Sequence, residues 1–322
     1  MEPLTFEGVL AAGEVVAAHL PPTPAWSYPL LDARVGVRVV VKHENVQPTG
    51  AFKVRGGVNL AATLRGTTGV RGLVTASTGN HAQSMAYAAR LAGTRAVVVA
   101  PEGSPPVKLD AVRGLGAEVV VHGPSMTEAA QRAHELAAAD GLTYVDPGNE
   151  PAIVLGHATV YLELLRQYPD LEAVYVPVGS GTGAAGACLV RDALAPGCRV
   201  VGVQSSAAPA AYRSWRGREL ATAPCDTRMS GLATAAGFAL PQSVLVDRLD
   251  DFLLVTDDDI AAAAALLAGH AHTLAEGAGA AALAGLLADP ARPAFCAVVV
   301  TGGNATPDEI AALSVASSRS AS

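Results

Sequence analysis

The chain has 322 residues, of which 50% are apolar and 16% are charged, and its formal net charge is −7. This length allows a large hydrophobic core in one large domain or in two lobes, and the composition excludes a disordered chain. The negative charge and the lack of any basic run argue against nucleic acid as the main partner.

The cysteines and histidines show no metal-binding pattern. The four cysteines have no C-x-x-C spacing, which predicts reduced thiols and no metal site. Met1-Glu2-Pro3 lacks the basic and apolar segments of a signal peptide, and polar residues interrupt the most apolar run, 260–287. We therefore expect a cytoplasmic protein that does not contact membranes.

The predicted elements alternate along the chain. The first are a helix over 5–20, an extended entry at 21–24, a strand over 37–42 and a helix from Lys53 to Arg65. Strands at 72–76, 95–100, 118–122 and 143–145 then alternate with helices at 80–92, 105–114 and 125–139. A second series comprises a helix at 151–167, a strand at 173–178, a helix at 183–194 and a strand at 199–204. A loop-rich part at 205–250 precedes a strand at 252–255, helices at 258–271 and 277–288, a strand at 296–300 and a frayed tail after Ile310.

Short apolar strands separated by helices indicate parallel βαβ units with right-handed crossovers. The predicted fold class is therefore α/β. In open α/β sheets, ligands bind beyond the carboxyl ends of the strands, so the loops that follow strands are the first candidates for a site.

Lys53 is the first candidate catalytic residue. The chain has only three lysines, Lys42, Lys53 and Lys108. Lys53 opens a helix, close to the positive end of its macrodipole, and lies between Phe52 and Val54. Both surroundings disfavour the ammonium form and predict a neutral, nucleophilic amine. The alternative is a surface lysine whose stem packs on the protein.

Two loops that lead into helices have the composition of anion sites. Ser77-Thr78-Gly79-Asn80-His81 offers hydroxyls and free amides, which suit a carboxylate, although simple helix capping also explains them. The glycine-rich loop 179–186 follows a strand and predicts a phosphate site. It also matches the dinucleotide pattern G-x-G-x-x-G of an NAD-binding oxidoreductase, but Gln204 stands where that fold expects an acid.

Two further stretches complete the set of candidates. Thr301-Gly302-Gly303-Asn304 follows the last strand, and Glu276 is a lone acid in an apolar stretch. A buried carboxylate is either paired or functional, because unpaired burial is costly.

Together these stretches resemble the threonine/serine dehydratase (ammonia-lyase) and serine racemase group of the fold-type II pyridoxal-phosphate enzymes. The resemblance covers roughly residues 20–305. Its motifs occur in the family's order: 42–45, 49–56, 77–83, 179–183, 230–233, 276–279 and 301–304. It implies two lobes, each an open, mostly parallel sheet with helices on both faces, as in the tryptophan synthase β subunit. The large lobe would be residues 1–66 with 153–322, the small lobe 67–152, and the assembly a homodimer.

The resemblance also implies a role for each matched residue. Lys53 would hold pyridoxal 5'-phosphate and move the substrate's α-proton, with Thr78 as the second catalytic residue. The other cofactor residues would be Phe52, Asn80, Gly179, Ser180, Gly181, Thr182, Gly183, Glu276 and Thr301. The substrate carboxylate would be held by Ser77, Thr78, Gly79, Asn80 and His81.

The implied reaction converts a 3-hydroxy amino acid such as threonine or serine to a 2-oxo acid and ammonia. Some positions depart from the pattern: Thr78 replaces a serine of the racemases, His157 replaces a usual glutamine, and Gln204 and Ala210 replace cation-binding acids. Because only about eighteen residues follow Asn304, no regulatory domain is expected. The alternatives are a racemase, a β-replacement enzyme, the NAD-binding oxidoreductase and a binding domain without activity.

Overall fold

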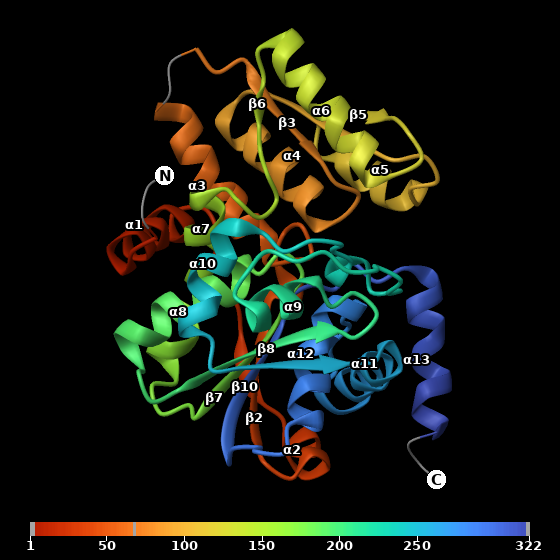
Figure 1. The fold of residues 1–322 in the computed structure, drawn as a ribbon. Helices are drawn as coiled ribbons and strands as arrows, with labels where there is room; N and C mark the ends of the chain where they lie inside the picture. Colours follow the sequence, from red (N-terminus) through yellow and green to blue (C-terminus); the bar gives the residue numbers. More distant parts are fainter. Residues whose placement is uncertain (1–3, 67–68, 320–322) are drawn as a thin grey trace.

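The structure is a computed structural model that describes residues 4–66 and 69–319. Within these residues the strands form two sheets, one in each half of the molecule (Figure 1). The six strands of the large sheet lie in the order β1 (Ala25–Ser27), β2 (Arg38–His43), β10 (Phe295–Val300), β7 (Ala173–Pro177), β8 (Arg199–Ser205) and β9 (Asp251–Val255). The four strands of the small sheet lie in the order β5 (Glu118–Val121), β4 (Arg95–Ala100), β3 (Gly72–Ala76) and β6 (Thr143–Tyr144).

Neighbouring strands pair in parallel except for β1, which is antiparallel to β2 at the edge of the large sheet. The central strands are runs of small branched residues, such as Val39–Val41 and Val97–Val99, and they are buried on both faces. Continuous apolar strands of this kind are typical of parallel sheets that helices cover on both sides.

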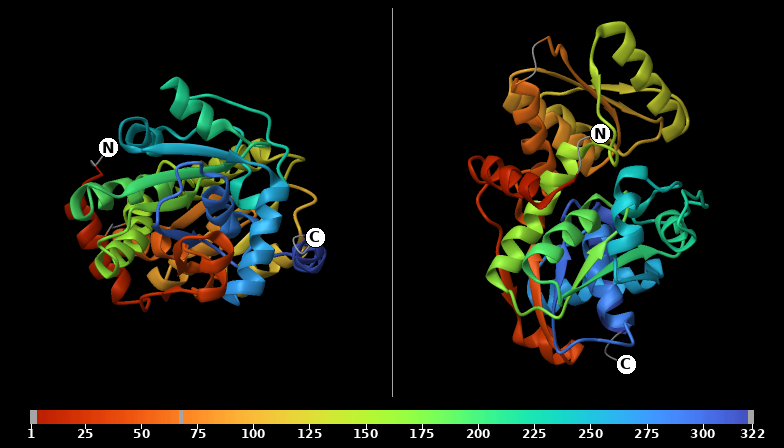
Figure 2. Two further views of the ribbon diagram at one scale, coloured as in Figure 1. Left: turned by 90° about the horizontal axis from the view of Figure 1, so that it is seen from below. Right: turned by 60° about the vertical axis from the view of Figure 1, so that its left-hand side comes forward.

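Helices cover both faces of each sheet (Figure 2). On the large sheet, α7 (Pro151–Gln167), α8 (Thr182–Leu194) and α10 (Ala239–Arg248) pack on one face, and α2 (Pro29–Val35), α11 (Asp257–Ala271) and α12 (Gly277–Ala288) pack on the other. On the small sheet, α4 (Asn80–Ala92) and α5 (Pro106–Gly114) lie opposite α6 (Met126–Asp140). The remaining elements are α1 (Phe6–Ala17), α3 (Lys53–Gly66), α9 (Ala210–Gly217), α13 (Pro307–Arg319) and the 3-10 turns η1 (Glu44–Val46) and η2 (Ser230–Leu232).

The predicted fold class is confirmed. The bounds predicted for α4, α7, α12, β3 and β4 agree with the structure residue for residue. The predicted loop-rich part at 205–250 contains α9, η2 and α10, which are separated by the long loops 218–229 and 233–238. Pro241 lies in the first turn of α10, where its missing N–H is not needed.

The prediction of a frayed tail is wrong, because α13 continues to Arg319. A capping box starts this helix: the amide of Glu309 donates to Thr306 Oγ1 at 3.2 Å, and the amide of Thr306 donates to Glu309 Oε2 at 2.7 Å. Such reciprocal bonds satisfy two amides that the helix itself leaves free.

Helix α3 runs between the two halves and contacts α4 on one side and α7 on the other. The division into lobes at 66/67 and 152/153 stays a prediction, and its first boundary adjoins Thr67 and Thr68, which lie outside the described residues. The expectation for Met1–Pro3 lies outside them as well. No helix of the described chain is long and apolar enough to cross a bilayer.

Candidate active site

The predicted loops 77–81, 179–186 and 301–304 follow the carboxyl ends of β3, β7 and β10, and the loop that carries Lys53 follows β2. The expectation that Glu276 also follows a strand is wrong, because it lies between helices α11 and α12. Two of the loops are joined through their backbones. The amide of Phe52, just before Lys53, donates to the carbonyl of Thr301 at 2.9 Å, and the amide of Gly303 donates to the carbonyl of Gly50 at 2.9 Å. The loop that carries Lys53 is therefore fixed to the end of β10.

Lys53 is the first residue of α3, as predicted, and its side chain is partly buried. Its Nζ donates to Thr182 Oγ1 at 3.3 Å and lies 5.1 Å from the centre of the Phe52 ring. Burial lowers the pKa of the Lys53 amine from 10.5 to about 8. A sizeable neutral fraction is therefore present near neutral pH, which is what a nucleophile or a base requires.

Lys42 is a buried lysine with a different environment. Its Nζ donates to the carbonyl of Thr23 at 2.9 Å and to Glu163 Oε2 at 2.6 Å. Arg55 completes this buried cluster with bonds to Glu44 at 2.7 Å and to Glu163 at 2.6 Å. Breaking a buried ion pair costs about 3–5 kcal/mol, so this cluster fixes the first turns of α3 against α7.

The glycine loop after β7 is shaped for close approach. A Cβ at Gly179 would lie 2.5 Å from the carbonyl oxygen of Gly231, and Gly181 has a φ of +91°. Helix α8 begins here without a side-chain cap, so its first amides are free for an anion. Thr182 Oγ1 lies 3.4 Å from Ser180 Oγ, which places both hydroxyls at this helix terminus.

The dinucleotide pattern has a packing explanation. A Cβ at Gly186 would lie 2.7 Å from the Cα of Ala158, so this glycine allows α7 and α8 to pack closely. Nothing in that contact requires a nucleotide.

Helix α4 also begins without a side-chain cap on its first turn. Ser77 Oγ accepts from the amide of Gly79 at 3.2 Å, and Ser77, Thr78 and Gly79 are all partly exposed. His81 turns away from this loop into the small lobe, where its Nε2 lies 3.0 Å from Thr75 Oγ1. Burial first, and then the charge of Lys53, lowers the pKa of His81 to about 3. Only its backbone amide is placed to meet a carboxylate.

Glu276 and Asn80 connect the two halves of the molecule. Asn80 Nδ2 donates to Glu276 Oε1 at 2.5 Å, and Asn80 Oδ1 accepts from Asn304 Nδ2 at 2.8 Å. Burial raises the pKa of Glu276 from 4.5 to about 7. Thr301 is also buried, and its hydroxyl donates to the carbonyl of Ala278 at 3.4 Å.

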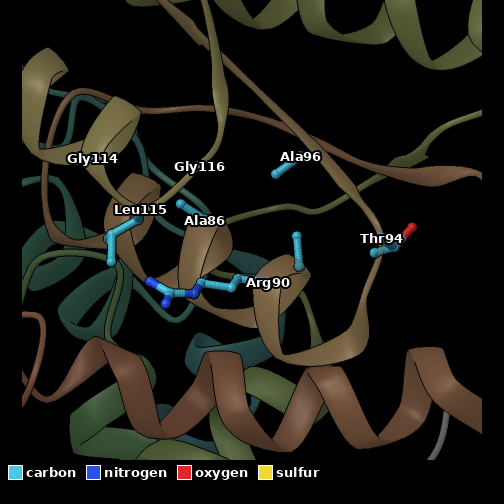
Figure 3. Close-up of a pocket in the computed structure, with 8 residues that line it drawn as sticks. Ala86, Arg90, Thr94, Ala96, Gly114, Leu115 and Gly116 are labelled. Carbon is cyan, nitrogen blue, oxygen red and sulfur yellow. The ribbon is translucent and has the colours of Figure 1, made fainter.

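A pocket of about 390 Å³ lies beside the small sheet, between α4 and the segment that follows α5 (Figure 3). Arg90, Thr94 and Leu115 are among the residues that line it. It contains none of the predicted site residues, and the arrangement around Lys53 is the candidate site.

The comparisons with known proteins agree with this geometry. A family model described as pyridoxal-phosphate dependent enzyme matches residues 16–302. The chain belongs to this family. The L-threonine dehydratase biosynthetic IlvA of Pasteurella multocida is 37% identical over 82% of this chain, but the chain spans only 52% of that relative.

Two other proteins match over most of their length. The beta-hydroxyaspartate dehydratase of Paracoccus denitrificans is 33% identical to this chain. The match covers 95% of this chain and 98% of the relative. The structure of maize serine racemase is 26% identical, covers 99% of both chains and has a TM-score of 0.90.

The residues present fit pyridoxal phosphate. A buried lysine of lowered pKa lies beside a glycine loop whose amides are free, and this combination suits an aldehyde that carries a phosphate. The phenol oxygen of Tyr161 is buried without a hydrogen-bond partner among the described residues, and it would lie 3.3 Å from a Cβ at Gly183. The Tyr161 hydroxyl is therefore a hydrogen-bond donor without a partner among the described residues, at the first turn of α8.

Gln204 stands where the resemblance places a cation-binding acid. In the described part of the chain, no group of acidic, histidine and cysteine side chains could hold a metal. Gln204 Oε1 accepts from the amide of Tyr212 at 3.0 Å, so its Nε2, a donor, faces the interior without a partner among those residues. A donor at that place repels a cation.

The structure adds His157, Tyr161 and Ser84 to the predicted site. Ser84 Oγ donates to the carbonyl of Lys53 at 2.6 Å, and His157 lies between Lys53 and Thr182. The sequence marked His157 as unusual in its motif, but nothing in the sequence indicated its contacts, because its partners lie 25 and 104 positions away.

Proposed function

We propose that this chain is a pyridoxal-phosphate-dependent lyase that converts a 3-hydroxy amino acid to a 2-oxo acid and ammonia. The observation that carries the proposal is the Lys53 amine, which has a pKa of about 8 and donates to Thr182 at the start of α8, a helix without a side-chain cap. The names of the Pasteurella and Paracoccus relatives support a hydroxy amino acid as the substrate.

Each end of the site has a separate task. The free amides at the start of α8, among them the backbone amide of Thr182, and the hydroxyl of Ser180 would hold the cofactor phosphate. Phe52 would flank the ring, Asn80 and Glu276 would hold its edge, and Thr301 would offer a hydroxyl to its nitrogen. The loop from Ser77 to His81 binds the substrate carboxylate at the start of α4. These contacts hold the α-carbon of the substrate near Lys53.

Bound pyridoxal phosphate supplies an electron sink for the pair of electrons left when the α-proton is removed. Lys53 is the base: its neutral amine accepts that proton, and the pKa of about 8 matches the working pH of a general base. Thr301 brings a neutral hydroxyl, not a carboxylate, to the ring. It therefore adds no negative charge beside the ring. The electron pair left on the α-carbon is then removed from the substrate when the β-hydroxyl departs.

Chemical trapping tests the role of Lys53. Borohydride reduction of the purified protein, followed by peptide mapping, should place the cofactor label on Lys53. Lys53→Ala should bind the cofactor without turnover, because the phosphate site stays intact while the base is lost. A label on Lys42 or Lys108 would refute the assignment.

A keto-acid assay tests the substrate class. We expect activity with serine, threonine, 3-hydroxyaspartate or 3-phenylserine, each tested in both β-configurations. A protein that holds the cofactor on Lys53 and releases no 2-oxo acid from any of them is not this lyase.

We further propose that the enzyme acts in the cytoplasm as a homodimer and contains two lobes, residues 1–66 with 153–322 and residues 67–152. The negative net charge and the lack of a membrane-spanning helix in the described chain support a partner set limited to the amino-acid substrate and a second copy. Sedimentation analysis would test the dimer.

A further inference from the structure

His157 is fully buried on α7, and both of its ring nitrogens lie near atoms of the site. Nε2 lies 3.4 Å from the backbone carbonyl oxygen of Lys53, and Nδ1 lies 3.0 Å from Thr182 Oγ1. Its ring also packs against Phe52, with the ring centres 4.5 Å apart. A Cβ at Gly56 would lie 2.6 Å from Nε2, so the glycine provides the space for this ring.

The surroundings fix which nitrogen carries the proton. Burial lowers the pKa of His157 well below 6.5, so the ring is neutral and has one N–H. The Lys53 carbonyl can only accept, so the proton belongs on Nε2 and Nδ1 is the acceptor. Thr182 must then donate its hydroxyl proton to Nδ1, and a lone pair of the same oxygen faces Lys53.

The result is a chain of hydrogen bonds that runs from the backbone carbonyl of Lys53 to its side-chain amine. The backbone carbonyl accepts from His157, His157 accepts from Thr182, and Thr182 accepts from the Lys53 amine at 3.3 Å. Because the hydroxyl proton of Thr182 is committed to His157, it is not available for the lone pair of the amine.

We propose that His157 is a positioning residue that orients the Thr182 hydroxyl, so that the free Lys53 amine is held as a donor with its lone pair unblocked. The kinetic consequence rests on the proposed function, in which that lone pair takes the α-proton. Without His157, the Thr182 hydroxyl turns and donates to the lone pair, which stabilises the neutral amine and makes it a poorer base.

Two substitutions separate this role from packing. His157→Gln keeps one donor and one acceptor but loses the ring, whereas His157→Phe keeps the ring and loses both polar atoms. If His157 acts only through packing, the Phe variant should behave more like the wild type. If it acts through the chain of hydrogen bonds, the Gln variant should.

The first measurement needs no turnover. Competitive acetylation of the cofactor-free protein over a range of pH, read by mass spectrometry, gives the titration midpoint of Lys53, with the partly exposed Lys108 as internal reference. In His157→Phe we expect this midpoint to fall by about one pH unit, the size of one net hydrogen bond, while His157→Gln keeps it. Thr182→Val removes the oxygen that accepts from the Lys53 amine, so the ammonium form loses a partner and the midpoint should also fall, even where the Phe variant does not fold.

The second measurement is the dehydration assay on the holoenzyme. His157→Phe should lower kcat about tenfold or more with KM little changed, as for other residues that orient a reacting group, and His157→Gln should recover most of the loss. An unchanged Lys53 midpoint in both His157→Phe and Thr182→Val, or an equal loss of kcat in the Gln and Phe variants, would overturn the proposal. A wild-type enzyme that dehydrates nothing would overturn the proposed function and leave the labelling result to decide the role of His157.

Discussion

The carboxyl group of Glu276 offers a quantitative test of the site. It is only 5% exposed, and burial, followed by a smaller effect of the nearby Glu309 charge, raises its pKa from 4.5 to about 7, against the opposing bond from Asn80. A raised carboxyl pKa means that the folded state holds a proton that the unfolded chain has released. The protonated group therefore contributes its full stability below pH 4.5, and this contribution is lost as the pH rises through 7.

The shift of about 2.5 pKa units corresponds to about 3 kcal/mol, of which most falls between pH 5 and 8.5. Glu276→Gln keeps an acceptor for Asn80 and removes the ionisation. The free energy of unfolding of the variant, relative to the wild type, should therefore rise by about 2–3 kcal/mol from pH 5 to pH 8.5.

Urea unfolding of the cofactor-free proteins at both pH values measures this difference. Exchange of the exposed Glu102 for Gln controls for the loss of one negative charge. Infrared difference spectra should also show the protonated carboxyl band of Glu276 disappearing near pH 7. A constant difference between wild type and variant at both pH values would refute the argument that Glu276 is buried as a neutral acid.

Three further predictions concern the cofactor, the cation site and the reaction. Gly179→Ala should abolish cofactor binding, measured by visible absorbance, because its Cβ has a backbone carbonyl only 2.5 Å away; Gly197→Ala, with nothing within 4 Å, should bind normally. EDTA should leave activity and melting temperature unchanged, since Gln204 and Ala210 provide no anionic ligand, and a loss restored by magnesium would contradict this. With L-serine in deuterated water, pyruvate should form much faster than D-serine, because the branched Thr78 is a poorly placed proton donor; equal rates would indicate a racemase.

Local signals were sufficient for most of the fold. The valine runs of β2 and β4 and the helix termini of α4 and α7 follow from composition, periodicity and glycine positions alone. The short edge strand β1 and helix α2 were missed because they are only three and seven residues long and are stabilised by contacts with distant residues.

The sequence was enough to predict individual residues of the site, but not the hydrogen bonds between them. Lys53, Asn80 and Glu276 stood out as unusual residue types in their surroundings, but the 2.5 Å contact between Asn80 and Glu276 joins positions 196 apart. His81 illustrates the limit: the sequence places it in an anion loop, and only the structure shows that its ring binds Thr75 inside the small lobe. Where a side chain points depends on packing between elements, which no short sequence window contains.

Helices α4 and α8 both begin with backbone amides that no side chain caps, so the stability of the folded chain depends on the anions that bind there. A missing side-chain cap costs about 1 kcal/mol of helix stability, and both helices begin without one. Anions that bind there complete the helices, and a ligand present at about a hundred times its Kd adds about 2.7 kcal/mol to the free energy of unfolding. We therefore expect a chain without its cofactor to open more often and to be degraded sooner, so that the cofactor supply would affect how much of the enzyme persists as well as how much of it is active.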